Sequence, residues 1–271
     1  MRLDPQSVAS AMAEVAATEI MPRFRNLAAE DIRKKHGDET VTVADEAAER
    51  ALALRLRDLI PGSVVVGEEG TAVDAGLLDL LAGNDPVWVI DPIDGTRNFA
   101  SGKPDFGVMV ALVRHNEILA GWIYNPVLKR AYVAEKGAGA WRDGERIARA
   151  QDAPPEDKEL RGSIAYMFFP DRTRERLRAK VNEGLVRPTD RSCAARIYVD
   201  IADGHQHFVL FRNMKPWDHL PGALIVAEAG GLVAKWDRSP YRPTDTSGGI
   251  LVAGRPEIWE RIRALLVAGQ S

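Results

Sequence analysis

The sequence contains little of what defines several large classes of protein. Cys193 is its only cysteine, so no internal disulfide can form, which is typical of a chain kept in a reducing compartment. No apolar run reaches the roughly 18 residues that a membrane-spanning helix requires. The formal net charge is only -3, so the chain as a whole has no strong attraction to nucleic acid or to acidic membranes.

These absences predict where the protein is found. The first residues contain Asp4, Glu14 and Glu19 and no continuous apolar stretch, which argues against a signal peptide. Hydrophobic residues make up 45% of the chain and charged residues 28%, as in an ordinary globular protein. We expect a cytoplasmic protein that has no membrane anchor and does not bind nucleic acid.

Hydrophobic spacing in the first half predicts helices followed by strands. Val8, Met12 and Val15 recur at helical spacing before Pro22, and a second apolar stripe predicts a helix over 45–60. Apolar runs then predict two strands, and β-rich segments joined by short turns predict an antiparallel meander. These strands are predicted at 64–66, 87–90, 107–114, 117–124 and 130–135.

The second half has a different pattern, because its strands and helices alternate. A polar stretch with two prolines, 151–159, is the predicted boundary. Strands are predicted at 163–167, 207–211, 232–235 and 249–253, and helices at 172–182, 193–202, 218–229 and 256–267. The chain therefore divides into an α+β half, residues 1–152, and an α/β half, residues 153–271.

Acidic residues gather at three places where an element ends or begins. Glu68 and Glu69 follow strand 64–66, and Asp91-Pro92-Ile93-Asp94-Gly95-Thr96 follows strand 87–90. Asp218 begins helix 218–229. Taken singly, each has an ordinary structural explanation: an exposed turn, a stiff Asp-Pro turn and a helix N-cap.

Taken together, these carboxylates predict a metal site. Ligands of α/β proteins bind at strand ends, so the three segments are expected to converge, and oxygen ligands without His or Cys favour Mg²⁺, Mn²⁺ or Ca²⁺. At ~4 Å and an effective dielectric near 20, each pair of carboxylate charges would cost roughly 4 kcal/mol. A bound divalent cation is the simplest compensation, so the candidate ligands are Glu68, Asp91, Asp94 and Asp218.

The loop after strand 87–90 also has the features of a phosphate-binding turn. Pro92 fixes its own φ, so the two flanking aspartates and the carbonyl of Ile93 can face the same side. Gly95 allows the backbone to turn closely, and the amides of Gly95 and Thr96 can form an anion-binding nest. Cations on one side and amides on the other would hold a phosphate group.

These segments resemble a known family. Segment 88–96, followed by Asn98 and Phe99, resembles the first signature of the inositol monophosphatase family, and segment 217–231 resembles the second. Segments 67–69 and 41–45, with Lys34 before the latter, also match, so the resemblance extends from about residue 34 to 253. It implies a layered αβαβα sandwich of the inositol monophosphatase/fructose-1,6-bisphosphatase type, with the metal site at the junction of the two halves.

The resemblance also implies roles for residues. Glu68, Asp91 and the Ile93 carbonyl would hold one Mg²⁺; Asp91, Asp94 and Asp218 would hold a second, and a weaker third would bind near Glu68. Mn²⁺ is a substitute. Asp45, Thr96 and Glu68 would orient and deprotonate the attacking water, and the Gly95 and Thr96 amides would bind phosphate. Sensitivity to lithium and a homodimer are implied as well.

The chemistry agrees with these roles. Phosphate monoesters hydrolyse very slowly unaided, and paired cations about 3.5–4 Å apart lower the barrier by activating water and stabilising the leaving oxygen. No covalent nucleophile is then required. Cys193 has no activating motif and is interpreted as structural.

The sequence departs from the family pattern at the positions that bind the substrate. Inositol-specific members place a glutamate seven residues before the aspartate equivalent to Asp218, but this chain has Phe211 there. The hydroxyl-binding segment of the family is altered to Cys193-Ala194-Ala195-Arg196. Phe211 either contacts substrate or packs in the core, and Arg196 either approaches a second anionic group or forms an ion pair. The histidines at 205, 207 and 219 are interpreted as ordinary packed or solvated side chains.

The leading hypothesis is Mg²⁺-dependent hydrolysis of a small phosphorylated metabolite, such as an inositol-phosphate-like polyol or sugar phosphate. Histidinol phosphate, fructose 1,6-bisphosphate and 3′-phosphoadenosine 5′-phosphate are alternative substrates within the same fold. A regulatory binding protein that retains the fold is an alternative of another class. A purely structural calcium site is a third, and it gives Thr96 no role.

Overall fold

The structure, a computed structural model, describes residues 3–35, 39–147, 154–184, 186–189 and 193–267. Helix α1 (Pro5–Val15) begins after the N-cap Asp4, and a π-helical turn, Ala16–Ile20, continues it. Helix α2 (Val43–Leu59) begins with a capping box, in which the Asp45 carboxylate accepts a hydrogen bond from the Thr42 amide. Within the described ranges, no helix combines the length and the apolar composition needed to cross a membrane.

The first sheet has seven strands in the order β3-β4-β5-β6-β7-β8-β9. They are β3 (Val64–Gly67), β4 (Val87–Asp94), β5 (Gly107–Arg114), β6 (Glu117–Asn125), β7 (Arg130–Glu135), β8 (Gly139–Arg142) and β9 (Glu145–Arg146). Strands β3 and β4 are parallel, and all the other pairs are antiparallel. The predicted meander is therefore confirmed, and β5 and β7 have the predicted bounds.

Several short elements were not predicted from the sequence. Strands β1 (Ile32–Lys34) and β2 (Thr40–Thr42) pair as a hairpin ahead of α2. Helix α3 (Glu68–Val73) follows β3 directly, a 3₁₀ segment, Ala75–Ala82, comes next, and α4 (Thr96–Ala100) follows β4. None of these is long enough to show a hydrophobic period of its own.

The second sheet has five strands in the order β11-β10-β12-β14-β13. They are β10 (Arg161–Ile164), β11 (Arg187–Pro188), β12 (Phe208–Phe211), β13 (Leu232–Lys235) and β14 (Ile250–Ala253). The prediction of a strand over 163–167 was wrong at its end, because Tyr166–Phe168 is a 3₁₀ turn. Ile164 pairs with Leu210 near the end of β12, so the chain beyond it has little left to pair with.

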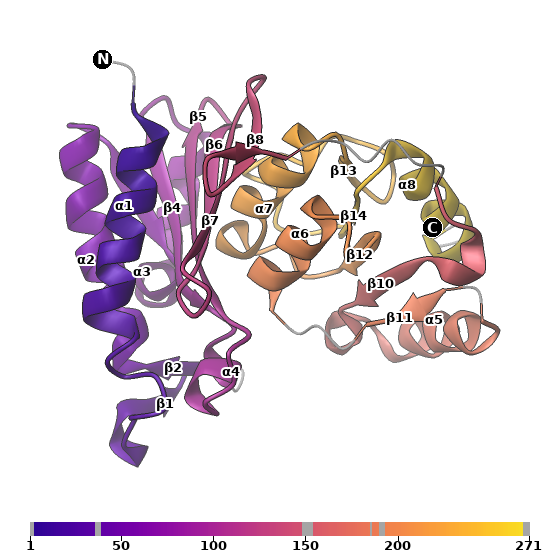
Figure 1. The fold of residues 1–271 in the computed structure, drawn as a ribbon, viewed down its shortest axis with the longest axis horizontal. Helices are drawn as coiled ribbons and strands as arrows, with labels where there is room; N and C mark the ends of the chain where they lie inside the picture. Colours follow the sequence, from indigo (N-terminus) through magenta and orange to yellow (C-terminus); the bar gives the residue numbers. More distant parts are fainter. Residues whose placement is uncertain (1–2, 36–38, 148–153, 185, 190–192, 268–271) are drawn as a thin grey trace.

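Helices separate and cover the two sheets, which gives the layered αβαβα sandwich that the sequence predicts (Figure 1). Helices α1 and α2 cover the outer face of the first sheet. Helices α6 (Ala194–Ala202) and α7 (Pro216–Glu228) lie between the sheets. On the far face of the second sheet are α5 (Asp171–Asn182) and α8 (Pro256–Ile262), the latter continued by a π-helical turn, Arg263–Val267.

The middle layer packs very closely on the first sheet. A Cβ added to Gly121 of β6 would lie 2.8 Å from the carbonyl oxygen of Pro221, which is inside α7. A Cβ added to Gly222 would lie 2.1 Å from Cγ of Tyr198 in α6. Glycine at these two positions therefore lets the backbone of α7 approach both β6 and α6.

The two sheets come from separate lengths of chain, since the first ends at Arg146 and the second begins at Arg161. The predicted boundary between residues 152 and 153 lies outside the described residues. The division into two halves remains a prediction.

Candidate metal and phosphate site

Three of the four predicted ligand side chains converge. Asp91 and Asp94 are in the last part of β4, where the pairing of β4 with β5 loses its register, and Asp218 is the third residue of α7. One carboxylate oxygen from each aspartate lies within 4.8 Å of the other two. The first sheet and the middle layer of helices therefore both contribute to one acidic cluster, which we call the aspartate cluster.

The aspartate cluster is costly in the absence of a cation. Burial, and then the charge of Glu68, raise the pKa of Asp91 and of Asp218 well above the ordinary range. The side chain of Asp91 is only 1% exposed, and its Oδ1 accepts no hydrogen bond. A buried oxygen without a donor, beside two other carboxylates, fits a divalent cation that prefers oxygen ligands.

Asp94 is held in place by the middle layer. Its Oδ2 accepts hydrogen bonds from the amide of Ala195, at 2.6 Å, and from Sγ of Cys193, at 2.8 Å. Burial, followed by the charge of Asp94, raises the pKa of the Cys193 thiol well above its ordinary value, so the thiol remains protonated and donates. These contacts support the interpretation of Cys193 as a structural residue.

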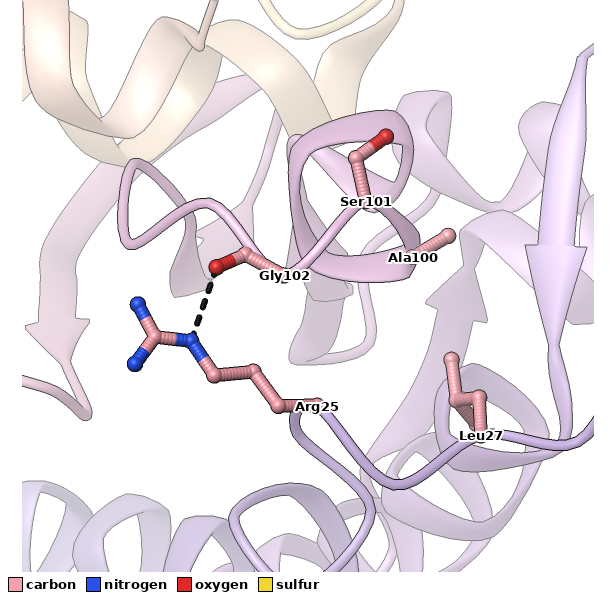
Figure 2. Close-up of a pocket in the computed structure, with 5 residues that line it drawn as sticks. All are labelled: Arg25, Leu27, Ala100, Ser101 and Gly102. Atoms are coloured by element: carbon pink, nitrogen blue, oxygen red, sulfur yellow. Dashed lines mark hydrogen bonds between the residues drawn. The ribbon is translucent and has the colours of Figure 1, made fainter.

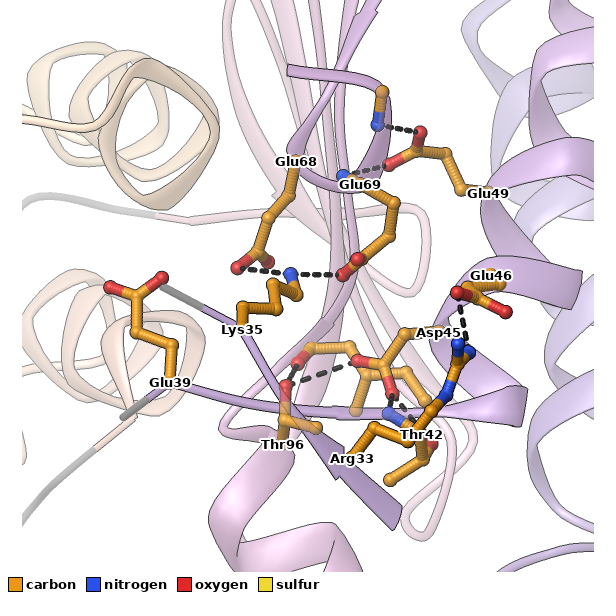
Figure 3. Close-up of polar contacts among 12 residues, drawn as sticks. Arg33, Lys35, Glu39, Thr42, Asp45, Glu46, Glu49, Glu68, Glu69 and Thr96 are labelled. Atoms are coloured by element: carbon orange, nitrogen blue, oxygen red, sulfur yellow. Dashed lines mark hydrogen bonds and ion pairs between the residues drawn. The ribbon is translucent and has the colours of Figure 1, made fainter. Parts of the chain in front are cut away.

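Glu68 lies beside the aspartate cluster but is not a member of it. The Nζ of Lys35 is 3.2 Å from Oε1 of Glu68 and 2.5 Å from Oε1 of Glu69 (Figure 3). Burial raises the pKa of Glu69 to about 7, against the opposing hydrogen bond from Lys35. Although burial tends to lower the pKa of Lys35, the charges of the two glutamates outweigh it and raise the value to about 12. The sequence reasoning did not identify Lys35.

Glu49 is a second residue that the sequence reasoning missed. From α2, its carboxylate accepts hydrogen bonds of 2.8 Å from the amides of both Glu69 and Gly70 (Figure 3). A Cβ added to Gly67 would lie 2.2 Å from the carboxyl carbon of Glu49, so a larger residue there would displace the Glu49 side chain. Glu49 thereby fixes the backbone that carries Glu68. Its spacing from Asp45, one helical turn earlier on α2, is the signal that could have found it.

Asp45 and Thr96 form the pair that the resemblance implies. The Thr96 hydroxyl lies 3.0 Å from Oδ1 of Asp45 and 2.9 Å from the carbonyl oxygen of Ile93, and it can donate its single proton to one of them at a time. Burial raises the pKa of Asp45 to about 6, although hydrogen bonds from the hydroxyl and the amide of Thr42 oppose this rise. Asp45 is thus a carboxylate that can exchange a proton near neutral pH.

Gly95 is placed as a phosphate-binding turn requires. It is the N-cap of α4 and has a φ of 88°, a conformation that favours glycine. A Cβ there would lie 2.9 Å from the carbonyl oxygen of Asp105. The first amides of α4 have no acceptor within the helix, which is the arrangement that binds anions. Binding of phosphate by Gly95 and Thr96 remains a prediction.

The two candidate substrate residues have structural partners. Arg196 forms an ion pair with Asp200, at 2.9 Å. Phe211 is 8% exposed and stacks on Tyr198, with 5.8 Å between ring centroids. Arg196 therefore forms an ion pair and Phe211 packs in the core, as one of the two alternatives for each residue predicts. A contact with substrate remains a prediction for both.

None of the three histidines belongs to the aspartate cluster. His219 is buried in α7, its Nε2 donates to the carbonyl of Asn213 at 2.8 Å, and burial lowers its pKa to about 4. The Nδ1 of His207 accepts a hydrogen bond from the amide of Arg161. The side chain of His205 is 68% exposed. These positions are those of packed or solvated histidines.

A separate cavity of about 410 Å³ lies where the segment after α1 meets the end of α4 (Figure 2). Arg25 lines it and donates from Nε to the carbonyl of Gly102, at 2.9 Å. Leu27, Ala100 and Ser101 complete the lining, so this cavity contains none of the predicted ligands.

Comparisons with known proteins identify the family and agree with the fold. A sequence model described as the inositol monophosphatase family matches residues 4–270. The fructose-1,6-bisphosphatase/inositol-1-monophosphatase of Thermotoga maritima is 32% identical over 206 residues, which is 75% of each chain. The Nus factor SuhB of Pseudomonas aeruginosa is 32% identical over 216 residues, 77% of this chain and 76% of that one.

Solved structures give the same answer for the fold. A Thermotoga maritima IMPase superposes with a TM-score of 0.79 at 27% identity, covering 95% of this chain and 94% of that one. An inositol monophosphatase from Zymomonas mobilis has a TM-score of 0.76 at 27% identity, covering 96% of both chains. The fold is that of the inositol monophosphatases. The chain belongs to the inositol monophosphatase family.

Proposed function

We propose that this protein hydrolyses a small phosphate monoester by direct attack of water, with Mg²⁺ held by Asp91, Asp94 and Asp218, assisted by Glu68 and the carbonyl of Ile93. The observation that carries the proposal is the aspartate cluster, with oxygens within 4.8 Å of one another and with an Asp91 oxygen that no donor satisfies. Bound cations would supply positive charge to the phosphate oxygens and would acidify water.

The other residues of the site have defined tasks in this proposal. Thr96 orients the attacking water, and Asp45 accepts its proton through the hydrogen bond that joins the two side chains at 3.0 Å. A carboxylate with a pKa near 6 suits a base that works close to neutral pH. The amides at the start of α4 bind the phosphate, so its position relative to Thr96 is fixed by the backbone.

Family membership and the local residues support a polyol or sugar phosphate as substrate. The Thermotoga maritima relative is named for both fructose 1,6-bisphosphate and inositol 1-monophosphate, and an Arabidopsis thaliana relative, 28% identical over 263 residues, is named a bifunctional phosphatase. Phe211, which lies where inositol-specific members have a glutamate, offers no charge to bind ring hydroxyls. We therefore infer a substrate with fewer hydroxyl contacts at that position than myo-inositol phosphate makes.

The test is release of phosphate from a panel of inositol, sugar, histidinol and nucleotide phosphates, with and without Mg²⁺. Asp94→Asn removes a ligand charge but retains an oxygen that can accept from the Ala195 amide, so it should fold and lose all Mg²⁺-dependent turnover. Asp58→Asn, at an exposed position of α2, is the matched control and should behave as the wild type. Equal turnover by Asp94→Asn and the control would refute the proposal.

A regulatory binding function is the second candidate, and one observation favours it. Two relatives at least 30% identical are named as Nus factors, from Pseudomonas aeruginosa and Xylella fastidiosa. Absence of turnover on the whole panel, with normal Mg²⁺ binding, would support this candidate over the enzyme. Three predictions remain to be tested. The purified protein can test lithium inhibition and the homodimer, and the cells of origin can test the cytoplasmic location.

A further inference from the structure

Lys35 places a positive charge inside the acidic site. Its side chain is only 11% exposed, and the side chains of its partners Glu68 and Glu69 are 14% and 12% exposed. Its Nζ lies within hydrogen-bond distance of a carboxylate oxygen of each. The backbone amide of Lys35 donates to the carbonyl of Glu39 at 2.8 Å, which ties the residue to the hairpin formed by β1 and β2.

We propose that Lys35 is a positioning residue for the proposed metal site. Its ammonium group holds Glu68 and Glu69 when no cation is bound beside them. It also competes for Glu68 with the weakest divalent cation, the one expected near Glu68, which we call the outermost ion. The inference rests on the proposed function, because it takes Glu68 and the aspartate cluster as a cation site. It goes beyond that function in assigning a chemical role to a lysine that is not a ligand.

The geometry indicates that the Lys35 side chain, rather than Glu68, moves when a cation binds. Glu49 holds the amides of Glu69 and Gly70 at 2.8 Å each, and its carboxylate lies against Gly67, so the backbone at Glu68 has little freedom to move. A cavity of about 700 Å³, lined by Lys35, Glu49 and Glu69 among others, lies beside the ion pairs. The Lys35 side chain therefore has space to leave while Glu68 remains in place.

Charge gives the direction of the effect. With both carboxylates ionised, one ammonium group between them leaves a net charge of one negative unit, which still attracts a cation. A cation that binds to the oxygen of Glu68 facing Lys35 meets both the occupied hydrogen bond and the repulsion of a like charge. Removing the lysine charge should therefore tighten binding of the outermost ion, and retaining it as arginine should not.

The test is calorimetric titration of Mg²⁺ and Mn²⁺ into metal-stripped protein, for the wild type, Lys35→Met and Lys35→Arg. Lys35→Met should bind the weakest ion about tenfold more tightly, with the tighter ions unchanged, and Lys35→Arg should remain near the wild type. Arg33→Met is the matched control, since it removes an equal charge two residues earlier in the chain. The Arg33 side chain forms an ion pair with Glu46 and is 53% exposed. This substitution should not change the affinity.

Thermal unfolding supplies a readout that does not depend on binding. In EDTA, Lys35→Met should melt a few degrees below the wild type, because two partly buried carboxylates lose their counterion, and saturating Mg²⁺ should close that gap. Unchanged or weaker binding of the outermost ion by Lys35→Met would overturn the inference. If the wild type itself binds no divalent cation, or Asp94→Asn binds as the wild type does, the proposed function fails instead.

Discussion

Replacing Asp91 by asparagine should make the metal-free protein more stable while it removes a ligand of the proposed metal site. Asp91 is the most buried carboxylate of the aspartate cluster, and one of its oxygens lies within 4.8 Å of an oxygen of Asp94 and an oxygen of Asp218. At an effective dielectric near 20, two ionised carboxylates at about this separation repel by roughly 3–4 kcal/mol. The new amide can also donate to the neighbouring carboxylates, which an ionised Asp91 cannot do.

The expected gain is smaller than the full repulsion. Burial and mutual repulsion already raise the pKa of all three aspartates, so part of the charge is neutralised by protons in the metal-free state. We expect Asp91→Asn to raise the free energy of unfolding in EDTA at pH 8 by about 1–3 kcal/mol. For a chain of this size, that corresponds to a Tm higher by about 2–6 °C.

The assay is thermal unfolding of both proteins in EDTA and in Mg²⁺, at pH 8 and at pH 5. Because the folded-state pKa of the aspartates is raised, the folded wild type binds protons that the unfolded chain releases. Its stability therefore falls as pH rises above 3.8, the ordinary pKa of an aspartate. The advantage of Asp91→Asn should therefore be larger at pH 8 than at pH 5. Mg²⁺ should raise the Tm of the wild type and leave that of the variant unchanged.

Two results would refute this reasoning. The first is a variant that is no more stable than the wild type in EDTA at pH 8, which would mean that the three charges do not repel one another in the folded chain. The second is an advantage of the same size at both pH values, which would attribute it to packing rather than to charge.

Three further predictions address the neighbours of the aspartate cluster. Thr96→Val keeps the side-chain shape but cannot donate to Asp45, so kcat should fall about a hundredfold with an unchanged Mg²⁺-induced rise in Tm; an unchanged kcat would remove Thr96 from the mechanism. Glu49→Ala leaves two amides of α3 without their acceptor and should cost roughly 2–3 kcal/mol in urea unfolding, whereas a loss near zero would show that water replaces the carboxylate. The pKa of His219 is lowered from 6.5 to about 4, so the unfolded chain takes up the proton more readily, and stability is lost as pH falls between these values. His219→Gln lacks this proton, so the stability difference between the wild type and His219→Gln should shrink by about 2–3 kcal/mol between pH 7.5 and pH 4.5, and a constant difference would contradict the assignment.

The parts of the fold that could be predicted are those whose pattern is local. Strand 107–114 has a continuous apolar run from Val108 to Val113 and is followed by a turn, so its limits follow from its own sequence. Strand 130–135 has an apolar run between Arg130 and Glu135, so its limits are local as well. The segment from Asp91 to Thr96 could be predicted as part of the candidate site, because Pro92 restricts the backbone and Gly95 permits the positive φ that follows β4. The structure brings both of its aspartates to one cluster.

The parts that could not be predicted depend on contacts between distant segments. Cys193 reaches Asp94 across 99 positions of sequence, and Lys35 reaches Glu68 across 33 from a hairpin too short to show a period. The hydrogen bonds from Glu49 likewise depend on where β3 ends relative to α2. The end of β10 at Ile164 is set by the length of its neighbour β12, which no pattern within 163–167 records.

The contact between Gly121 and Pro221 limits which amino-acid substitutions this protein can accept. Even a methyl group on Gly121 would stand 2.8 Å from a carbonyl oxygen and 2.9 Å from Cα of Pro221, so α7 would have to retreat from β6. Asp218 is part of α7 and would move with it, whereas Asp91 is part of β4 and would not. The distance between their carboxylate oxygens would therefore increase. A glycine outside the aspartate cluster thus limits which sequences can keep this arrangement. We expect a saturation library selected for the proposed activity to tolerate substitution at Gly121 as poorly as at Asp218.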